Sequence, residues 1–255
     1  MSFSDSKIET SEDLSTTSIW SKLFDFPQSQ FLSPEVFRYA GIPMFLCWSA
    51  KGGSGTTVVA AALALVFSQR HPVVLIDLGG DSPAALGIAE PHGPGVAEWF
   101  ASPTADVAAL SRLAVDATDA LQLIPRGAVA LPPPGDAQWA RLVAALAAHG
   151  TTVVIDSGSG APPAALLGAA THSLLVTRPC YLALRRAVAT GLHPTGIVLI
   201  DEPGRALTAR DVERSLNAPV VAELQYDPAV ARAVDAGLLA SRLPRSLAHS
   251  LKGAA

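Results

Sequence analysis

Apolar and polar positions alternate in blocks along most of the chain. Short uninterrupted apolar runs predict buried strands at residues 44–49, 73–78, 121–125, 151–156, 173–177, 196–200 and 220–224. The segments between them predict helices at residues 56–69, 95–100, 105–113, 136–149, 162–170, 182–190, 208–215 and 228–236. Residues 79–94 are rich in Gly and Pro and are expected to be a connection. This order predicts an α/β fold, a doubly wound, mostly parallel sheet with helices on both faces.

Two of the predicted helices begin at recognisable capping residues. Thr208 opens one helix, and Asp211 lies three residues later, where its carboxylate is able to complete a capping box. Asp227 precedes a helix that Gly237 is expected to end. These signals fix the helix boundaries in the last quarter of the chain.

The tail at residues 241–252 carries leucines four residues apart, which places them on one helical face. The leucines and the basic residues beside them are Leu243, Leu247, Leu251, Arg242, Arg245 and Lys252. We interpret this segment as a helix that closes the core. The alternative is a helix that makes a peripheral membrane contact.

Residues 1–43 differ in composition from residues 44–255, so we divide the chain there into an N-terminal extension and a folded domain. The extension is rich in Ser and Thr and contains a single Ala, and residues 1–17 are expected to be disordered. An aromatic cluster follows at residues 19–39. It is either a segment that packs on its own domain or a docking motif for a protein partner.

The charge and the cysteines narrow the class of protein. The net charge is −4, and no basic cluster is larger than Arg185-Arg186, so nucleic-acid binding is disfavoured. Cys47 and Cys180 are isolated in apolar surroundings, which is typical of reduced core cysteines in a cytoplasmic protein. No apolar run reaches 18 residues, and the N-terminus is polar, so neither a membrane span nor a signal peptide is expected.

A glycine-rich turn at residues 51–57 joins the first predicted strand to the first predicted helix. Its sequence predicts an anion site, because glycines let the backbone approach a phosphate and the helix N-terminus favours negative charge. We predict that every residue of the turn binds the ligand: Lys51, Gly52, Gly53, Ser54, Gly55, Thr56 and Thr57. The ordinary phosphate loop, GxxxxGK followed by Ser or Thr, is not matched, since Ala50 replaces its first Gly and Thr56 its Lys.

Two carboxylates lie at the ends of predicted strands, where ligands bind in doubly wound sheets. Asp77 ends the second strand and Asp156 ends the fourth. Hydroxyl and carboxylate oxygens suit Mg²⁺, so we predict a metal site at Thr57, Asp77 and Asp156. The alternative for Asp156 is a carboxylate that only caps the next helix.

The loop Lys51-Gly52-Gly53-Ser54-Gly55-Thr56-Thr57 resembles the deviant phosphate loop of the MinD/ParA family, KGGxGK followed by two Ser or Thr residues. Within residues 51–57 it differs only at the second lysine, which Thr56 replaces. The resemblance implies a P-loop NTPase fold, ATP and Mg²⁺ as ligands, and a homodimer. It also implies that Lys51 reaches the nucleotide of the partner protomer.

Residues 173–187 (SLLVTRPCYLALRRA) and 218–239 (APVVAELQYDPAVARAVDAGLL) look closest to the CpaE/TadZ-like branch of that family. This resemblance implies a role in the localisation or assembly of a Flp/Tad-type pilus or of septum machinery. It also implies recruitment of a cytoplasmic protein to the membrane or the cell pole.

Three departures from the family pattern concern the nucleotide. Thr56 replaces the second lysine, whose charge-assisted hydrogen bonds are worth about 1.5–3 kcal/mol each. Gly79 replaces the second Asp of the family's D-x-D, which orients the attacking water, and Asp81 is the nearest carboxylate after it. No Asn occurs at residues 198–203, where the family contacts adenine.

These departures leave three hypotheses. In the first, the protein is a nucleotide-dependent switch that binds ATP with weak or absent hydrolysis. In the second, it is a nucleotide-free pseudo-ATPase scaffold. In the third, it is an active ATPase that uses Lys51 with Asp81; Lys51 and Asp77 are the candidate catalytic residues.

Overall fold

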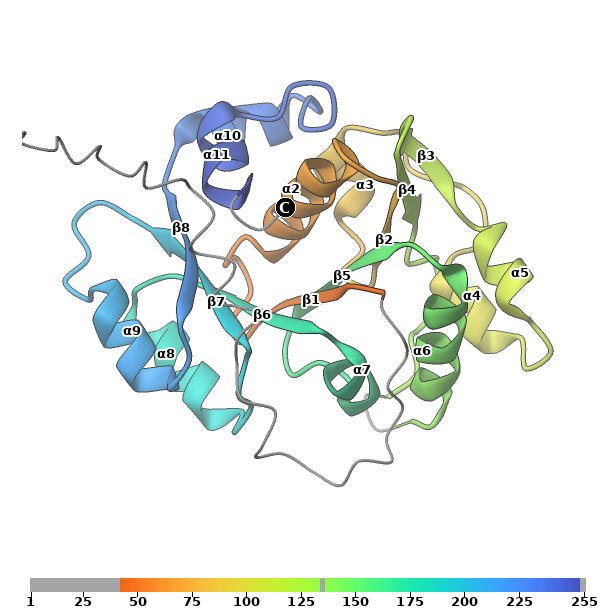
Figure 1. Cartoon of the computed structure of the whole chain (residues 1–255), viewed down its shortest axis with the longest axis horizontal. Helices are drawn as coiled ribbons and strands as arrows, with labels where there is room; N and C mark the ends of the chain where they lie inside the picture. The colour runs from red at the N-terminus through yellow and green to blue at the C-terminus, as the bar shows by residue number, and fades with distance from the viewer. Residues whose placement is uncertain (1–41, 134–135, 253–255) are drawn as a thin grey trace, which may run out of the picture.

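A computed structural model describes residues 42–133 and 136–252, which form one eight-stranded sheet with the strand order β3-β4-β2-β5-β1-β6-β7-β8 (Figure 1). The strands are β1 Met44–Ser49, β2 Val73–Asp77, β3 Val115–Thr118, β4 Leu121–Ile124, β5 Thr152–Ser159, β6 His172–Thr177, β7 Gly196–Asp201 and β8 Val220–Gln225. Only β3 runs antiparallel to its neighbour. The predicted doubly wound sheet is confirmed.

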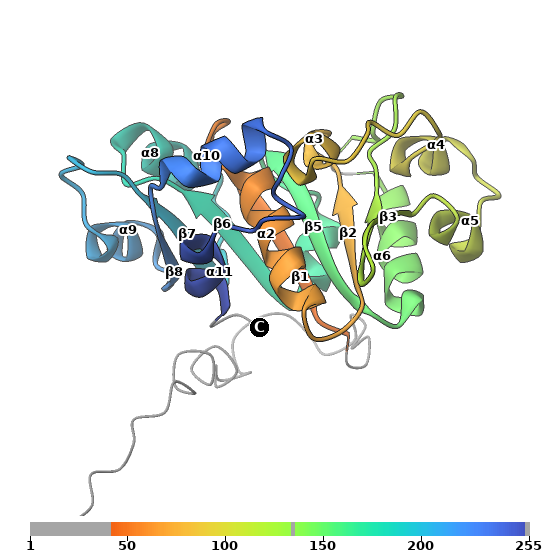
Figure 2. The ribbon, with the colours of Figure 1, turned by 90° about the horizontal axis from the view of Figure 1, so that it is seen from above.

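Helices cover both faces of the sheet (Figures 1 and 2). One layer consists of α2 Thr56–Ser68, α3 Ser82–Leu86, α10 Pro228–Asp235 and α11 Arg245–Lys252. The other consists of α4 Val96–Ala101, α5 Val107–Ser111, α6 Gln138–His149, α7 Ala164–Ala169, α8 Tyr181–Ala189 and α9 Ala209–Leu216. Each layer has its own hydrophobic cluster, because the buried strands present apolar side chains to both faces.

The central strand β1 lies between β5 and β6, where the chain order of the sheet reverses. All six of its residues are buried, and Trp48 donates a hydrogen bond from Nε1 to Ser173 Oγ on β6 at 3.0 Å. The last residue of β2, Asp77, lies opposite Asp156 in β5. The topology therefore brings the glycine-rich turn, Asp77 and Asp156 to one edge of the sheet.

The predicted helix caps in the last quarter of the chain are present. Asp211 N–H donates to Thr208 Oγ1 at 3.3 Å, and Thr208 N–H donates back to Asp211 Oδ2 at 2.9 Å. Asp227 Oδ1 accepts from Ala229 N–H at 2.8 Å. Both caps satisfy donors that the first turn of a helix leaves open.

Two elements are absent from the sequence-based prediction. The connection at residues 79–94 contains the five-residue helix α3, and β3 adds an antiparallel edge strand. A cysteine also differs from expectation, since Cys47 is buried but Cys180, at the start of α8, is only half-buried. Burial raises the pKa of the Cys47 thiol, which keeps it protonated. The aromatic cluster and the predicted disordered segment fall outside the described residues.

The tail forms α11, and its leucines pack into the core as predicted. Leu247 and Leu251 are 5% and 1% exposed and belong to the cluster that contains α2 and the end of β8. The apolar face of this helix is thus already covered by the protein's own core. Within residues 42–133 and 136–252, no helix combines the length and apolar character that crossing a membrane requires.

Replacing Leu251 with Ala is expected to lower the free energy of unfolding by about 2–5 kcal/mol, because it leaves a cavity in the core. Chemical denaturation followed by circular dichroism measures this change. Leu238→Ala is the matched control: Leu238 is 39% exposed, and its loss is expected to change stability by about 0.5 kcal/mol or less. Equally small changes for both variants would show that α11 does not close the core.

Candidate functional site

The turn at residues 51–57 is held open by backbone geometry that only glycine adopts readily. Gly53 and Gly55 have φ of 76° and 91°, in the left-handed region. Two serine hydroxyls fix the turn from within: Ser54 Oγ donates to Lys51 O at 2.7 Å, and Ser49 Oγ donates to the same oxygen at 3.1 Å. These hydrogen bonds and glycine conformations hold the loop in a defined shape at the start of α2, the position from which we predict it to bind an anion.

A cavity of about 480 Å³ lies over this loop. Its walls come from the loop, the first turn of α2, the ends of β2 and β5, and the segment after β4. The lining residues are Ser49, Gly52, Gly53, Ser54, Gly55, Thr56, Thr57, Val58, Leu78, Gly79, Asp81, Arg126, Ser157, Gly158 and Ser159. Six of the seven predicted binding residues thus face one cavity.

Lys51 is the seventh predicted residue, and it does not line the cavity. Its Nζ donates to the carbonyl oxygen of Gly52, its own neighbour, at 3.2 Å. The side chain is partly exposed at the rim of the loop. In this structure the loop lysine therefore supplies no charge to the interior of its own site.

Asp156 is fully buried within β5, which continues to Ser159 instead of ending at this residue as predicted. Its Oδ1 accepts from Gly158 N–H at 2.9 Å, whereas Oδ2 has no hydrogen-bond partner among the described residues. Burial raises the pKa of this carboxyl, and the nearby Thr57 hydroxyl opposes that rise. The carboxylate does not cap α7, the next helix, whose first turn follows Pro163.

An unpartnered buried carboxylate oxygen beside a threonine hydroxyl fits Mg²⁺, which takes hard oxygen ligands. No group of three or more His, Cys, Asp or Glu side chains that would hold a metal occurs in the part of the chain that the structure describes. A magnesium ion at Thr57 and Asp156 would therefore need its remaining ligands from water and from a phosphate.

Asp77 is also fully buried, but its oxygens already have partners. Oδ1 accepts from Gly80 N–H at 2.7 Å, and Oδ2 accepts from Ser82 N–H at 3.2 Å, at the start of α3. Burial raises the pKa of Asp77 to about 6, and the charge of Asp156 contributes to that rise. Asp77 lines a neighbouring cavity instead of the phosphate-loop cavity. Its geometry is that of a residue that holds the β2–α3 connection, and its metal and catalytic roles stay predictions.

Gly79 lies directly against Asp156. A Cβ atom at position 79 would be 3.1 Å from Asp156 Oδ2. Asp81, two residues further on, is exposed at the mouth of the same cavity, and its charge raises the pKa of Asp156. A side chain at position 79 would therefore share the space around Asp156 Oδ2.

Two arginines that the sequence analysis did not single out lie at this edge of the sheet. Arg126 lines the phosphate-loop cavity, and its Nη1 donates to Gly79 O at 3.2 Å. Arg178 lines the second cavity described below. Both directly follow predicted strands, and this position at the carboxyl end of a strand is the sequence feature that could have identified them as candidate site residues.

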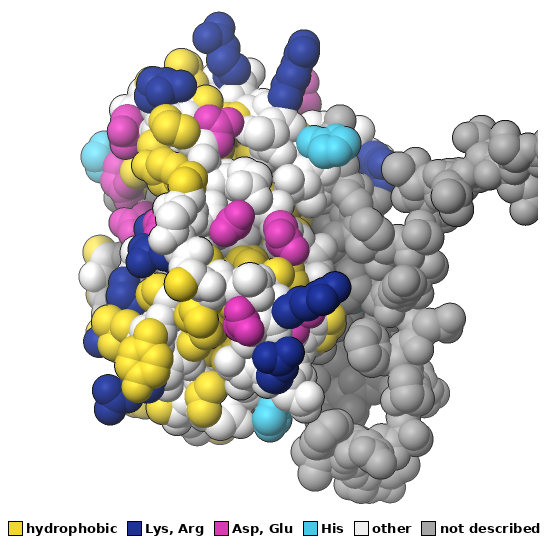
Figure 3. Space-filling model, turned by 90° about the vertical axis from the view of Figure 1, so that its left-hand side faces the viewer, with side chains coloured by type: hydrophobic (Ala, Val, Ile, Leu, Met, Phe, Trp, Pro, Cys, Tyr) yellow, Lys and Arg dark blue, Asp and Glu magenta, His cyan; other side chains and the backbone are white. Residues whose placement is uncertain are grey.

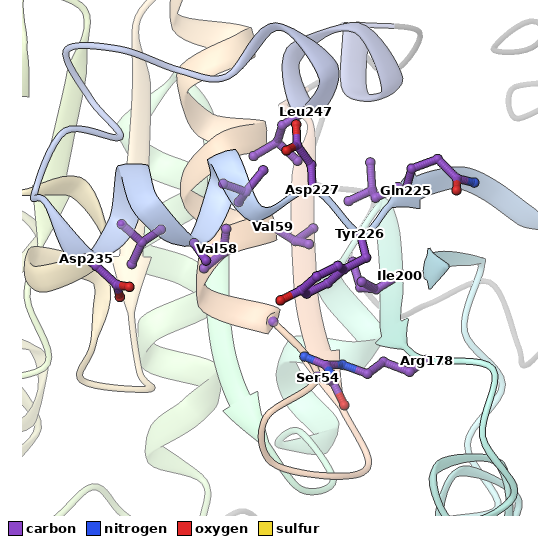
Figure 4. Close-up of a pocket in the computed structure, with 15 residues that line it drawn as sticks. Ser54, Val58, Val59, Arg178, Ile200, Gln225, Tyr226, Asp227, Asp235 and Leu247 are labelled. Carbon is purple, nitrogen blue, oxygen red and sulfur yellow. The ribbon is translucent and has the colours of Figure 1, made fainter. Parts of the chain in front are cut away.

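A second cavity of about 300 Å³ adjoins the first and shares Ser54, Gly55 and Val58 with it. Its remaining lining residues come from α2, β7, β8, α10, α11, the residue after β6 and the connection between β8 and α10. They are Val59, Arg178, Ile200, Leu224, Gln225, Tyr226, Asp227, Val230, Ala231, Val234, Asp235 and Leu247. Figure 4 shows Tyr226 and Arg178 extending toward Ser54 from the ends of β8 and β6. The mainly apolar floor suits a flat ring, such as a base.

Glu202, the residue that follows β7, is engaged in ion pairs and does not line the cavity. Glu202 forms ion pairs with Arg178 and Arg205. Arg205, and then Arg178, hold the pKa of the Glu202 carboxyl below its usual value. Near the end of β7, Ile200 lines the cavity. Ile200 has no side-chain amide with which to bind a ligand.

Comparison with known families assigns the chain to a family. Residues 45–240 match the model of the CobQ/CobB/MinD/ParA nucleotide binding domain, which covers more than half of the chain. The chain belongs to this family. A comparison with curated protein sequences finds no significant match.

Solved structures of MinD/ParA proteins share the fold. A ParA family ATPase from Chlorobium tepidum TLS is 21% identical, with a TM-score of 0.69 over 83% of this chain and 96% of that one. The septum site-determining protein MinD from Pyrococcus horikoshii OT3, complexed with Mg-ADP, is 16% identical, with a TM-score of 0.65 over 84% and 94%. The MinC:MinD cell division protein complex from Aquifex aeolicus gives 17% identity and a TM-score of 0.64 over 83% and 94%.

The three departures from the MinD/ParA sequence pattern can be located in the structure. Thr56 lines the phosphate-loop cavity without a charge, and Gly79 lies against Asp156 without a side chain. Ile200 lines the second cavity at the end of β7. All three fall on the cavity walls, so each changes what a nucleotide in this site would contact.

Proposed function

We propose that this protein is a MinD/ParA-type switch that binds ATP with Mg²⁺ and hydrolyses it slowly or not at all. The observation that carries the proposal is the combination at the phosphate loop. The cavity is open and lined by Thr57, Asp156 Oδ2 is buried without a partner, and Gly79 beside it has no side chain. The binding parts of the site are retained, whereas the position that would orient water is empty.

The two adjoining cavities suit the two ends of a nucleotide. The phosphates would lie over residues 52–57, and the base in the apolar cavity under Tyr226. Thr57 and Asp156 would hold Mg²⁺, which neutralises phosphate charge when bound. The related MinD from Pyrococcus horikoshii is complexed with Mg-ADP, which supports this choice of ligand.

The switch would act through protein partners. We propose an ATP-dependent homodimer formed by the domain at residues 44–255, and a docking role for residues 19–39 of the extension. The related MinD of Aquifex aeolicus forms a complex with MinC, which supports a protein target. The segments that resemble the CpaE/TadZ-like branch contribute β6, α8, β8 and α10, so the proposed setting is a Flp/Tad-type pilus or septum machinery.

Binding to nucleic acid is not part of the proposal. At the β8 edge of the sheet, Lys and Arg side chains are interspersed with acidic and hydrophobic ones (Figure 3). The net charge of −4 adds no general attraction to phosphate backbones.

Titration calorimetry with ATP and Mg²⁺, combined with light scattering, tests the proposed switch. We expect micromolar binding together with dimer formation. The second candidate is a nucleotide-free scaffold, which the uncharged Thr56 favours. Absence of binding at millimolar ATP would overturn the switch and select the scaffold.

Replacing Thr56 with Lys is expected to tighten ATP binding by about 10- to 100-fold, because a lysine there adds charge-assisted hydrogen bonds to the phosphates. Thr56 is the first residue of α2 and already lines the cavity. Thr56→Met is the control, because a methionine side chain is similar in length to lysine but carries no charge. Equal affinities for the two variants in calorimetry would show that residue 56 does not face the phosphates.

A further inference from the structure

Arg126 is the only cationic side chain among the residues that line the phosphate-loop cavity. It comes from the segment after β4, far in sequence from the loop itself. Lys51 lies outside the lining, and Thr56 carries no charge. A site built for phosphate in this protein therefore receives its side-chain positive charge from Arg126.

The surroundings of Arg126 leave most of its donors available. Its Nη1 donates to Gly79 O at 3.2 Å, and guanidinium has five N–H donors in all. Among the described residues, the ion pairs found do not include Arg126. Its charge is thus not paired with a carboxylate in the described part of the chain.

The backbone around Arg126 gives the side chain room to lie there. Its Cδ would be 3.5 Å from a Cβ at Gly80, a residue with φ of 102°. Any larger residue at position 80 would be strained and would crowd the arginine. The β2–α3 connection therefore accommodates the guanidinium group at the cavity wall.

The topology places Arg126 and the second cavity at opposite ends of the phosphate loop. Arg126 follows β4, on one side of β1, whereas the second cavity is formed by β7 and β8 on the other side. A nucleotide with its base in the second cavity would extend its phosphates across the loop toward Arg126. The last phosphate of the chain would then lie nearest to it, beside Gly79 and Asp156.

We propose that Arg126 binds the terminal phosphate of the nucleotide and supplies the positive charge that residue 56 does not. This inference rests on the proposed nucleotide binding. A planar guanidinium donates two parallel hydrogen bonds to a phosphate, which suits this role. The contribution of Arg126 is accordingly larger for ATP than for ADP.

Calorimetry on the full chain with MgATP and MgADP tests this role in wild type, Arg126→Gln and Arg126→Lys. Gln keeps one donor for Gly79 O but has no charge. We expect Arg126→Gln to weaken ATP binding by about 10- to 100-fold and ADP binding less, and Arg126→Lys to lose less than Gln. Arg112→Gln, at an exposed site directly after α5 and outside the cavity lining, is the matched control and is expected to bind like wild type.

A rescue experiment separates phosphate binding from a role in holding the β2–α3 connection. Thr56→Lys added to Arg126→Gln is expected to restore ATP affinity, since it returns the charge from another position. Equal losses for ATP and ADP without rescue would overturn the inference and make Arg126 a positioning residue. Unchanged affinity in Arg126→Gln would overturn the inference and leave the switch standing, whereas absence of wild-type binding would overturn both.

Thermal unfolding of each variant shows whether weaker ATP binding results from a loss of folded structure. If Arg126→Gln melts early, Arg126→Lys keeps the test decisive, because it retains the charge and one donor to Gly79 O. A lysine variant that folds like wild type and binds ATP no better than a folded Arg126→Ala would also overturn the inference.

Discussion

Replacing Gly79 with Asp is expected to raise the rate of ATP hydrolysis by about 100-fold over wild type, the typical contribution of a positioned acid–base group. A Cβ at this position would be 3.1 Å from Asp156 Oδ2, a close contact that requires the Asp156 carboxylate to shift slightly. We expect the new carboxylate to lie beside Asp156 in the phosphate-loop cavity, which Gly79 lines. Gly79 is not among the residues with positive φ, and the substitution adds no backbone strain. Phosphate release at saturating MgATP measures the rate.

The new carboxylate has an electrostatic cost that makes this effect depend on magnesium. Asp77 and Asp156 already lie opposite each other, and burial raises the pKa of both. A third carboxylate beside them is repelled unless a cation neutralises the group. The hydrolysis gained by Gly79→Asp is therefore expected to vanish when Mg²⁺ is chelated.

Gly79→Asn is the matched control, because it has the same size without the charge. We expect it to hydrolyse ATP at the wild-type rate. Equal rates for the Asp and Asn variants would contradict the view that an absent carboxylate limits hydrolysis. A wild type that already hydrolyses ATP rapidly would favour the active-ATPase hypothesis, and Asp81→Asn would then identify the alternative carboxylate.

Most of the sheet was predictable because its strands are buried on both faces and therefore read as uninterrupted apolar runs. The edge strand β3 was missed for the opposite reason: its four residues are half-buried or exposed and carry no such run. The helix α3 was missed because its start depends on a tertiary contact, the carboxylate of Asp77 accepting from Ser82 N–H. A short segment held from outside gives little local signal.

The candidate site divides in the same way. The loop could be located from its glycines, whose left-handed backbone is a local requirement. The positions of two side chains depend on tertiary packing instead. Arg126 reaches the cavity because the segment after β4 lies beside Gly79. The side chain of Lys51 points away from the cavity lining and donates to Gly52 O. The sequence therefore predicts the position of a phosphate site more readily than it predicts which cationic side chain would bind the phosphate.

Removing the Lys51 side chain is expected to abolish ATP-dependent dimerisation. Among the described residues, the one hydrogen bond found for the Lys51 ammonium is to Gly52 O, and Lys51 does not line its own cavity. The prediction follows if this ammonium binds a phosphate of a second protomer across a shared interface. Light scattering at saturating MgATP is expected to give a dimer for wild type and a monomer for Lys51→Ala.

If Lys51→Ala no longer dimerises, its affinity for ATP shows whether Lys51 acts across the interface or in its own site. If Lys51 acts across the interface, Lys51→Ala still binds ATP in calorimetry, with the affinity of a protein unable to gain from dimerisation. Arg112→Ala, which removes an exposed cation elsewhere, is expected to dimerise normally. Dimers of Lys51→Ala would exclude the cross-protomer role. Loss of ATP binding at every protein concentration would instead place the lysine in its own site, and the cavity would then have two cations, Lys51 and Arg126.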